Sequence, residues 1–193
     1  GYSVVRGLLA THIAPADDGR SIIMRKYSLT EDKRETFPVT DVLQGEEAVS
    51  PRSFVYMETE PLFLTERGVY AVTAATVDGA MYTQNRSYYI NEALKEKGGI
   101  AKCEAARWQK YYVIAQGDRL YLLDTSQKSY SRGEPYSSYQ YECYLWTGIN
   151  ARILWEDGDG NLCFGDEKGN ICKFIHGVYH DYSEDGNKAI VAY

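Results

Sequence analysis

The sequence predicts an all-β protein, a β-propeller-like array of about four blades with one short helical insertion near residues 87–97. Three observations lead to this class. A glycine-turn hairpin recurs at nearly equal spacing, the strands beside each turn hold consecutive apolar residues, and tyrosine is abundant, with 18 residues against 5 Phe and 3 Trp. We expect a single domain over residues 1–193, either a complete ring or part of a larger propeller.

Four hairpins define the repeat. Each consists of an apolar strand, a polar turn that contains glycine and a second apolar strand, which is the usual signal of a β-hairpin. Their turn glycines are Gly19, Gly68, Gly117 and Gly169, separated by 49, 49 and 52 residues. We therefore expect these glycines to occupy equivalent places in successive sheets. The corresponding units are roughly residues 1–45, 46–98, 99–145 and 146–193.

The strands of these hairpins are predicted to be covered on both faces. Residues 111–115 and 120–123 are apolar at consecutive positions, whereas a sheet with one wet face would alternate apolar and polar residues. Blades packed face to face cover both sides of a strand. Further strands are expected at residues 24–29, 37–43, 54–57, 139–146, 151–155, 174–179 and 188–193.

One segment, residues 87–97, has the pattern of a helix. Ile90 and Leu94 are four residues apart, Ser87 is suited to cap the start, and Gly98 with Gly99 is a helix stop. We expect a short helix inserted in the second unit.

Charge and hydropathy exclude several classes of protein. The net charge of −6 repels nucleic acid and argues against a generic DNA-binding protein. A local excess of basic residues at 95–110 is interpreted as a solvated surface. No apolar run has the length of a membrane span, so no membrane partner is expected. Four cysteines without a CxxC pair favour a reducing compartment during folding.

Two weak metal-site patterns occur near the C-terminal end. Asp157, Asp159 and Asn161 resemble the start of a calcium loop, but Leu162 and Lys168 stand where that loop needs glycine and glutamate. Cys163 and Cys172 should face each other across their hairpin, and His176 and His180 would complete a zinc-type ligand set. A plain polar turn and buried cysteines are the preferred interpretations, so neither metal nor cofactor is predicted.

No catalytic constellation is evident. The three histidines are not accompanied by a nucleophile motif, and acids such as Glu58, Glu60, Asp124 and Glu134 show no spacing that favours paired-acid chemistry over solvated surface charges. Aromatic residues of the third and fourth units offer a binding surface instead. They are Tyr136, Tyr139, Tyr141, Trp146 and Trp155.

Several stretches within residues 60–190 resemble bacteriophage virion proteins of the tail-adaptor or packaged-DNA-stabilisation type, which are β-propellers. The stretches are residues 60–71, 84–91, 162–171 and 185–190. The resemblance implies a structural protein of the head-to-tail junction or the tail, encoded by a phage or prophage and assembled in the bacterial cytoplasm. It carries over no functional residue, because the matched positions build turns.

Three functions follow as hypotheses. The first is a noncatalytic virion module whose partners are other virion proteins or further copies of itself. The second is a carbohydrate-binding or receptor-binding propeller that uses the aromatic residues. The third is a propeller glycoside hydrolase with paired acids.

Overall fold

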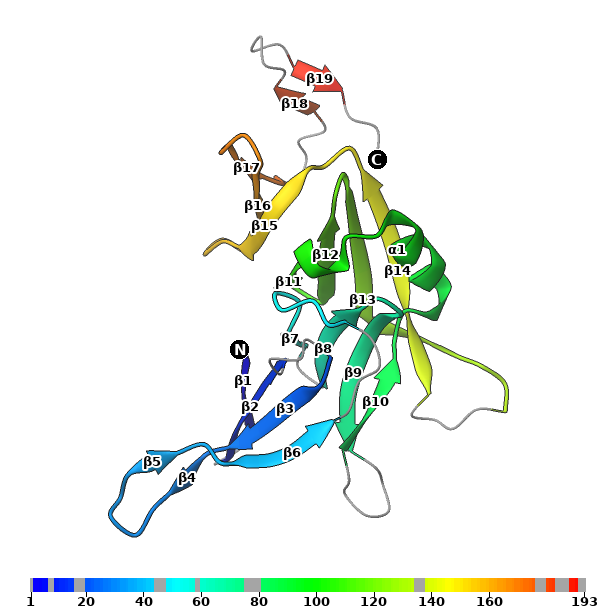
Figure 1. Ribbon diagram of the computed structural model, residues 1–193. Helices are drawn as coiled ribbons and strands as arrows, with labels where there is room; N and C mark the ends of the chain where they lie inside the picture. The colour runs from blue at the N-terminus through cyan, green and yellow to red at the C-terminus, as the bar shows by residue number, and fades with distance from the viewer. Residues whose placement is uncertain are drawn as a thin grey trace.

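Small antiparallel sheets that follow one another along the chain make up the protein (Figure 1). The computed structural model describes residues 2–6, 9–15, 20–43, 48–57, 60–74, 81–133, 138–175, 180–182 and 188–190. Strands account for 57% of the chain and one helical segment has ten residues, which confirms the all-β class and the single helical insertion. The described residues form no closed propeller ring.

The first two sheets are four-stranded meanders. Sheet 1 has the order β1 (Tyr2–Arg6), β2 (Leu9–Pro15), β3 (Ile22–Lys26) and β6 (Val39–Leu43). Sheet 2 has the order β7 (Val55–Met57), β8 (Glu60–Thr65), β9 (Gly68–Ala74) and β10 (Met81–Asn85). The strand expected over residues 24–29 is interrupted, because the chain leaves sheet 1 for a projecting hairpin of β4 (Ser28–Leu29) and β5 (Glu35–Thr36).

Sheet 3 repeats this pattern, and sheet 4 is shorter. Sheet 3 has the order β11 (Glu104–Trp108), β12 (Tyr111–Gln116), β13 (Arg119–Tyr130) and β14 (Tyr139–Thr147). Sheet 4 has three strands, β15 (Ala151–Glu156), β16 (Leu162–Asp166) and β17 (Ile171–Lys173). A separate pair, β18 (His180–Tyr182) and β19 (Lys188–Ile190), follows. The strand predicted over 174–179 is wrong for Phe174 and Ile175, which are irregular, and its other residues lie outside the described part.

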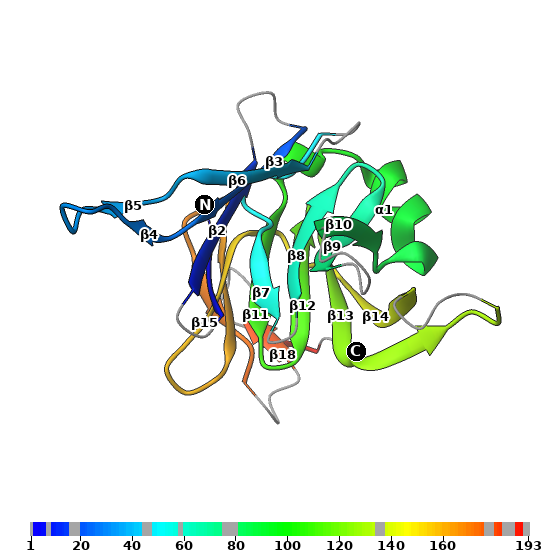
Figure 2. The ribbon, with the colours of Figure 1, turned by 90° about the horizontal axis from the view of Figure 1, so that it is seen from below.

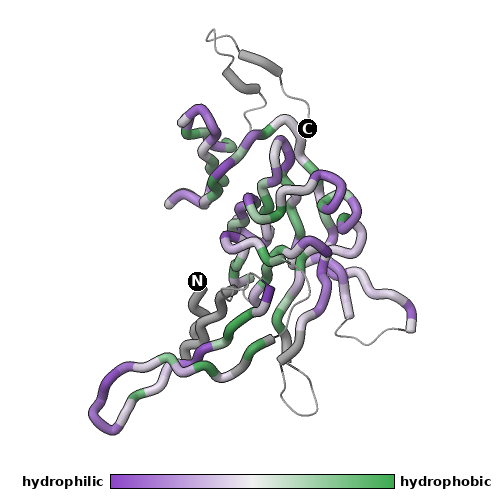
Figure 3. Tube along the Cα trace, viewed as in Figure 1, coloured by the Kyte–Doolittle hydropathy of each residue, from purple (hydrophilic) through white to green (hydrophobic). Residues whose placement is uncertain are grey.

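The sheets stack face to face through three apolar clusters. Ile22 and Met24 of sheet 1 pack with Phe63 of sheet 2, and Leu62 and Leu64 on the other face of β8 belong to the cluster shared with sheet 3. A third cluster joins sheets 3 and 4. Figure 3 shows the apolar residues gathered along these strands and the hydrophilic ones at the turns. The prediction that strands are covered on both faces is confirmed for β8, β12 and β13, whose central residues are buried at consecutive positions.

The first strands of successive sheets lie next to one another. β1 contacts β7, β7 contacts β11, and β11 contacts β15 (Figure 2). The later strands of each sheet therefore lie farther from the row of first strands. Helix α1 lies beside the later strands of sheets 2 and 3.

The helical insertion packs against the outer part of sheets 2 and 3. A 3₁₀ turn (Tyr88–Ile90) leads into α1 (Asn91–Lys97), and a second 3₁₀ turn (Ile100–Lys102) follows. Leu94 is fully buried, and Gly98 ends the helix with a φ of 66°. The expected Ser87 cap is wrong, because its hydroxyl accepts a hydrogen bond from the Val69 amide and donates to Asn91 Oδ1 instead. The Ser87 hydroxyl therefore bonds to sheet 2 and does not cap the helix.

Candidate functional site

Three of the four predicted turn glycines lie where the chain crosses from the second to the third strand of a sheet. Gly68, Gly117 and Gly169 all have positive φ, at 128°, 62° and 86°. Their positions within the turn differ, because Gly68 begins β9, Gly117 opens a two-residue loop and Gly169 closes a three-residue loop. Gly19 lies outside the described residues, between β2 and β3 in the sequence.

The predicted aromatic surface is wrong as a single exposed patch. Tyr139 and Tyr141 are 9% and 1% exposed and face sheet 2, whereas Trp146 lies on the opposite face of β14 and packs toward sheet 4. Trp155 is half-buried on β15, and Tyr136 lies outside the described residues. Successive side chains of a strand alternate between its faces, so the odd-numbered tyrosines and the even-numbered tryptophan of β14 separate.

Tyr139 and Tyr141 surround a buried ion pair that joins sheets 2 and 3. Arg86 Nε and Nη2 lie 2.7 and 3.0 Å from Glu60 Oε1 and Oε2, and the Tyr141 hydroxyl donates to Glu60 Oε1 at 2.7 Å. The Arg86 guanidinium lies 3.8 Å from the Tyr139 ring centroid. Burial alone would lower the pKa of Arg86, but the hydrogen bond and the charge of Glu60 hold it above its ordinary value. The Arg86 guanidinium therefore stays charged, and its bidentate contact with Glu60 serves the packing.

Asp124, the other buried acid that the sequence singled out, is also held by structural partners. Its carboxylate lies 2.7 Å from Lys110 Nζ and accepts hydrogen bonds from the Ser126 amide and hydroxyl at 3.0 and 2.6 Å. Burial would raise the pKa of Asp124, but these donors outweigh burial and lower it. Glu58 and Glu134 lie outside the described residues. Glu60 and Asp124 are therefore each paired with a basic side chain of their own, Arg86 and Lys110.

The residues of the calcium hypothesis form a turn whose Asp157 carboxylate is already paired with a lysine. Asp157 Oδ1 accepts hydrogen bonds from the Asp159 and Asn161 amides at 3.0 and 2.8 Å, and Lys173 Nζ lies 2.5 Å from Oδ2. The bond from Lys173, followed by that from Asn161, holds the pKa of Asp157 well below its usual range. A lysine occupies the place of a cation, which supports the plain polar turn.

The next turn repeats this arrangement. Asp166 Oδ1 accepts hydrogen bonds from the Lys168 and Asn170 amides at 2.9 and 2.8 Å. Both turns have the order Asp, two residues, Gly, Asn, and in both the glycine has positive φ. This spacing is visible in the sequence and marks two Asp-anchored turns rather than a metal loop.

The expectation that Cys163 and Cys172 face each other is wrong. The three-residue loop pairs Cys163 with Lys173 and Cys172 with Phe164, so the two thiols point to opposite faces of sheet 4. His176 lies outside the described residues, and the side chain of His180 does too. Within the described part of the chain, no cluster of three or more His, Cys, Asp or Glu residues could hold a metal ion.

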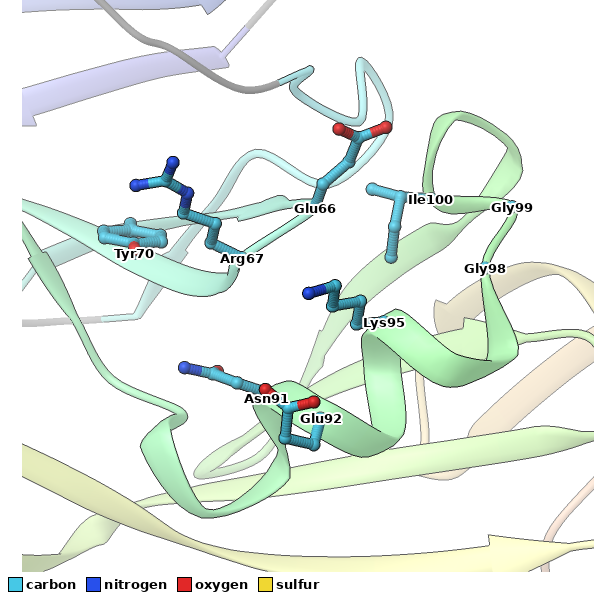
Figure 4. Close-up of a pocket in the computed structure, with 9 residues that line it drawn as sticks. All are labelled: Glu66, Arg67, Tyr70, Asn91, Glu92, Lys95, Gly98, Gly99 and Ile100. Atoms are coloured by element: carbon cyan, nitrogen blue, oxygen red, sulfur yellow. The ribbon is translucent and has the colours of Figure 1, made fainter.

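A pocket of about 610 Å³ opens between the β8–β9 turn and α1. Figure 4 shows Lys95 pointing from the helix into this space, with Arg67 and Tyr70 on the opposite wall. Glu66 and Glu92 balance the two cations, and Asn91 adds an amide. The pocket is not apparent from the sequence, because its two walls are about 25 residues apart in the chain and meet only when α1 folds back on sheet 2.

The chemistry of the pocket suits reversible binding of a polar ligand. It offers donors, acceptors and one aromatic ring, and its described lining includes no Ser, Cys or His to serve as nucleophile or imidazole base. Gln116, from β12, fixes the pocket wall by donating hydrogen bonds to the Leu94 and Gly98 carbonyls, both at 2.8 Å. The site is thus held in shape by sheet 3.

No model of a protein family matches the chain, and a search of curated proteins finds no match. Among the described helices, none has the length and apolar character to cross a membrane.

Proposed function

We propose that this protein is a noncatalytic interaction module built as an arc of a β-propeller, and that it is a structural protein of a bacteriophage or prophage particle. Its place would be the head-to-tail junction or the tail, with other virion proteins or further copies of itself as partners. The observation that carries the proposal is the stack of consecutive meanders, since such a scaffold presents turns and edges to partners.

The arrangement of the strands supports the propeller part of the proposal. Each sheet runs from its first to its last strand in chain order, apart from the projecting hairpin β4–β5, and the first strands of neighbouring sheets touch. Blades around an axis have this order, with the first strand nearest the axis. A larger ring, completed by more blades, would be consistent with the uncovered outer face of sheet 4, where Ile153 and Ile171 are 50% and 80% exposed.

The buried charges support the noncatalytic part. Glu60 is matched by Arg86, and Asp124 by Lys110, each in hydrogen-bonding distance. Structural ion pairs of this kind stabilise packing, so neither Glu60 nor Asp124 is an unpaired acid available for proton transfer. The resemblance of residues 60–190 to phage tail-adaptor proteins supports the virion setting.

The proposal is tested by determining whether purified phage particles contain the protein. Particles released by a host that carries the gene are purified on a density gradient, and their proteins are identified by mass spectrometry. We expect the protein to co-purify with the particles, and deletion of its gene to yield heads without attached tails. Its absence from particles that are otherwise complete would refute the virion role, and turnover of a glycoside panel would refute the noncatalytic role.

The pocket favours a second candidate, a carbohydrate-binding module. Tyr70 with the charged and amide groups of the pocket provides the mixture of ring and hydrogen-bonding groups that sugars need. On a glycan array, a hit that Lys95→Met and Tyr70→Ala both abolish would support this candidate. The matched control is Lys102→Met, an exposed lysine beyond the pocket lining. Signals at background for every glycan would exclude the carbohydrate-binding candidate.

A further inference from the structure

Sheet 4 ends one strand earlier than the other three sheets. In sheets 1, 2 and 3 the fourth strand, β6, β10 or β14, pairs antiparallel with the third. In sheet 4 the third strand is β17, and among the described residues it pairs with β16 alone. In the part of the chain that the structure describes, the position beside β17 is thus an open strand site.

The hydrogen bonds of β17 show which of its groups face this site. The Phe174 amide donates to the Leu162 carbonyl and the Asp166 amide donates to the Asn170 carbonyl, at 2.9 and 3.1 Å. Bonded pairs alternate with non-bonded pairs in an antiparallel ladder, so Cys172 also bonds toward β16 while Ile171 and Lys173 direct their N–H and C=O groups outward. We call these outward groups of Ile171 and Lys173 the open edge.

An aromatic surface lies beside the open edge. Tyr144 and Trp146 of β14 are on the face of sheet 3 that carries Leu120 and Leu122, which is the face packed against sheet 4. Trp146 packs on Phe174, just after β17, with ring centroids 5.2 Å apart, whereas Tyr144 is 45% exposed. We call Tyr144, Trp146 and Phe174 the aromatic shelf. It continues the interface of sheets 3 and 4 beyond the last strand of sheet 4.

The shape of the site selects a single strand over a second copy of this chain. β15 contacts β11 and β12, so the three strands of sheet 4 leave β14 as the part of sheet 3 under the empty position. Antiparallel pairing of two copies through β17 rotates one copy about an axis perpendicular to the sheet. The sheet 3 of each copy would then lie on the same side of the joined sheet 4, and the two β14 strands would overlap. A second copy therefore does not fit this position.

We propose that the open edge and the aromatic shelf bind one extended segment of a partner protein, which joins sheet 4 as its fourth strand. The segment pairs antiparallel with β17 through backbone hydrogen bonds, and every second side chain is apolar and packs on the shelf. This rests on the proposed role as an interaction module, and it adds the class of partner and the surface it uses.

Hydrogen exchange with a defined peptide tests the pairing. The probe is a synthetic peptide of about eight residues that alternates valine and threonine and ends in lysine, long enough for one strand. We expect the Ile171 and Lys173 amides to exchange at least about tenfold more slowly with the peptide, because each gains a bonded partner. The Cys172 amide, bonded to β16, is the internal control and should change little.

Two matched comparisons separate backbone pairing from apolar contact. A peptide of the same sequence, N-methylated at alternate amides, cannot donate to β17 and should bind at least about tenfold more weakly in fluorescence anisotropy. In the protein, Ile171→Pro removes the backbone N–H that points outward from β17 and makes no hydrogen bond to β16. Ile171→Ala keeps this N–H. We expect about tenfold weaker binding for Ile171→Pro and less than about twofold for Ile171→Ala.

Tyr144→Ala should weaken binding by about fivefold or more, which tests the shelf without touching the edge. The proposal is overturned by equal binding of the N-methylated peptide, by unchanged exchange at Ile171 and Lys173, or by a dimer that Ile171→Pro dissociates. The peptide assays need no particle, so they can fail while the protein is present in virions, and they can succeed when it is not.

Discussion

At the scale of single residues, charged groups inside the protein serve as links between sheets. The Arg86 and Glu60 side chains are 1% and 6% exposed. Glu60 begins β8 of sheet 2, Arg86 directly follows β10, and Tyr139 and Tyr141 of sheet 3 enclose them. Removing two ions from water is costly unless they are paired and fully hydrogen-bonded, and this pair has the bidentate geometry that meets the condition. Loss of the pair should therefore lower the free energy of unfolding.

The first prediction concerns this pair. Glu60→Gln leaves the Arg86 charge buried without its partner and should lower the free energy of unfolding by about 3–5 kcal/mol, measured by urea denaturation. The double variant Glu60→Leu/Arg86→Met removes both charges and should recover most of that loss. If the double variant is as unstable as the sum of the single ones, the two residues do not act as a pair.

The second prediction concerns Asp124 and pH. Because its pKa is lowered in the folded protein, its stabilising contribution is complete above the ordinary aspartate pKa of about 3.9 and is lost as pH falls through the lower folded value. Asp124→Asn should therefore be less stable than the native protein by at least about 1 kcal/mol at pH 7. That difference should shrink below about pH 4. A difference independent of pH would show that the carboxylate charge is irrelevant.

At the scale of the element, the turns determine how each hairpin is placed. The loop at residues 66–67 pairs Thr65 with Gly68, whereas the three-residue loop before Asn170 shifts the register and sends Cys163 and Cys172 to opposite faces. A one-residue change in loop length reverses the faces of every following side chain. Helix α1 is in turn placed by contacts of Ser87 and Gln116 rather than by its own capping.

The third prediction compares two turn glycines. A Cβ at Gly68 would overlap Asn91 and lie 2.6 Å from Ser87 Oγ, whereas a Cβ at Gly169 meets nothing within 4 Å. Both residues have positive φ, so Gly169→Ala should cost about 1 kcal/mol from backbone strain alone. Gly68→Ala should cost at least about 2 kcal/mol in thermal or urea unfolding, because it also displaces the start of the helix. Equal costs would mean that the helix yields without penalty.

At the scale of the whole molecule, stability depends on stacking, since each apolar cluster of the described residues is shared by two sheets. Leu122 and Leu123 are neighbours on β13, and both are buried, at 2% and 0% exposure. Leu122 belongs to the cluster with sheet 4 and Leu123 to the cluster with sheet 2. Sheet 3 is therefore a middle layer, and sheets 2 and 4 cover its two faces.

The fourth prediction uses this pair of identical neighbours. Leu122→Ala and Leu123→Ala should each lower the free energy of unfolding by about 2–5 kcal/mol, because each leaves a cavity between two sheets. Leu145→Ala, at a site that is 49% exposed, is the control and should cost less than about 1 kcal/mol. If only one of the two buried changes is costly, one face of sheet 3 is open to water in solution.

The sequence by itself determined the all-β class, the glycine hairpins and the helix at 88–97, because these depend on local periodicity, turn chemistry and breaker residues that neighbouring positions encode. It also indicated that the strands around Val113 and Leu122 have no wet face, since their apolar residues are consecutive. The Asp-anchored turns at Asp157 and Asp166 were equally open to recognition from spacing alone.

Only the tertiary structure decided which side chains meet. It separated Tyr141 from Trp146, placed Arg86 against Glu60, opposed Cys163 to Lys173, and brought the β8–β9 turn to α1 to form the pocket. These outcomes depend on register and on which sheet covers which face, and a shift of one residue exchanges the two faces. The open edge of β17 is likewise a property of the assembled stack, because a strand is recognisable locally but its missing neighbour is not.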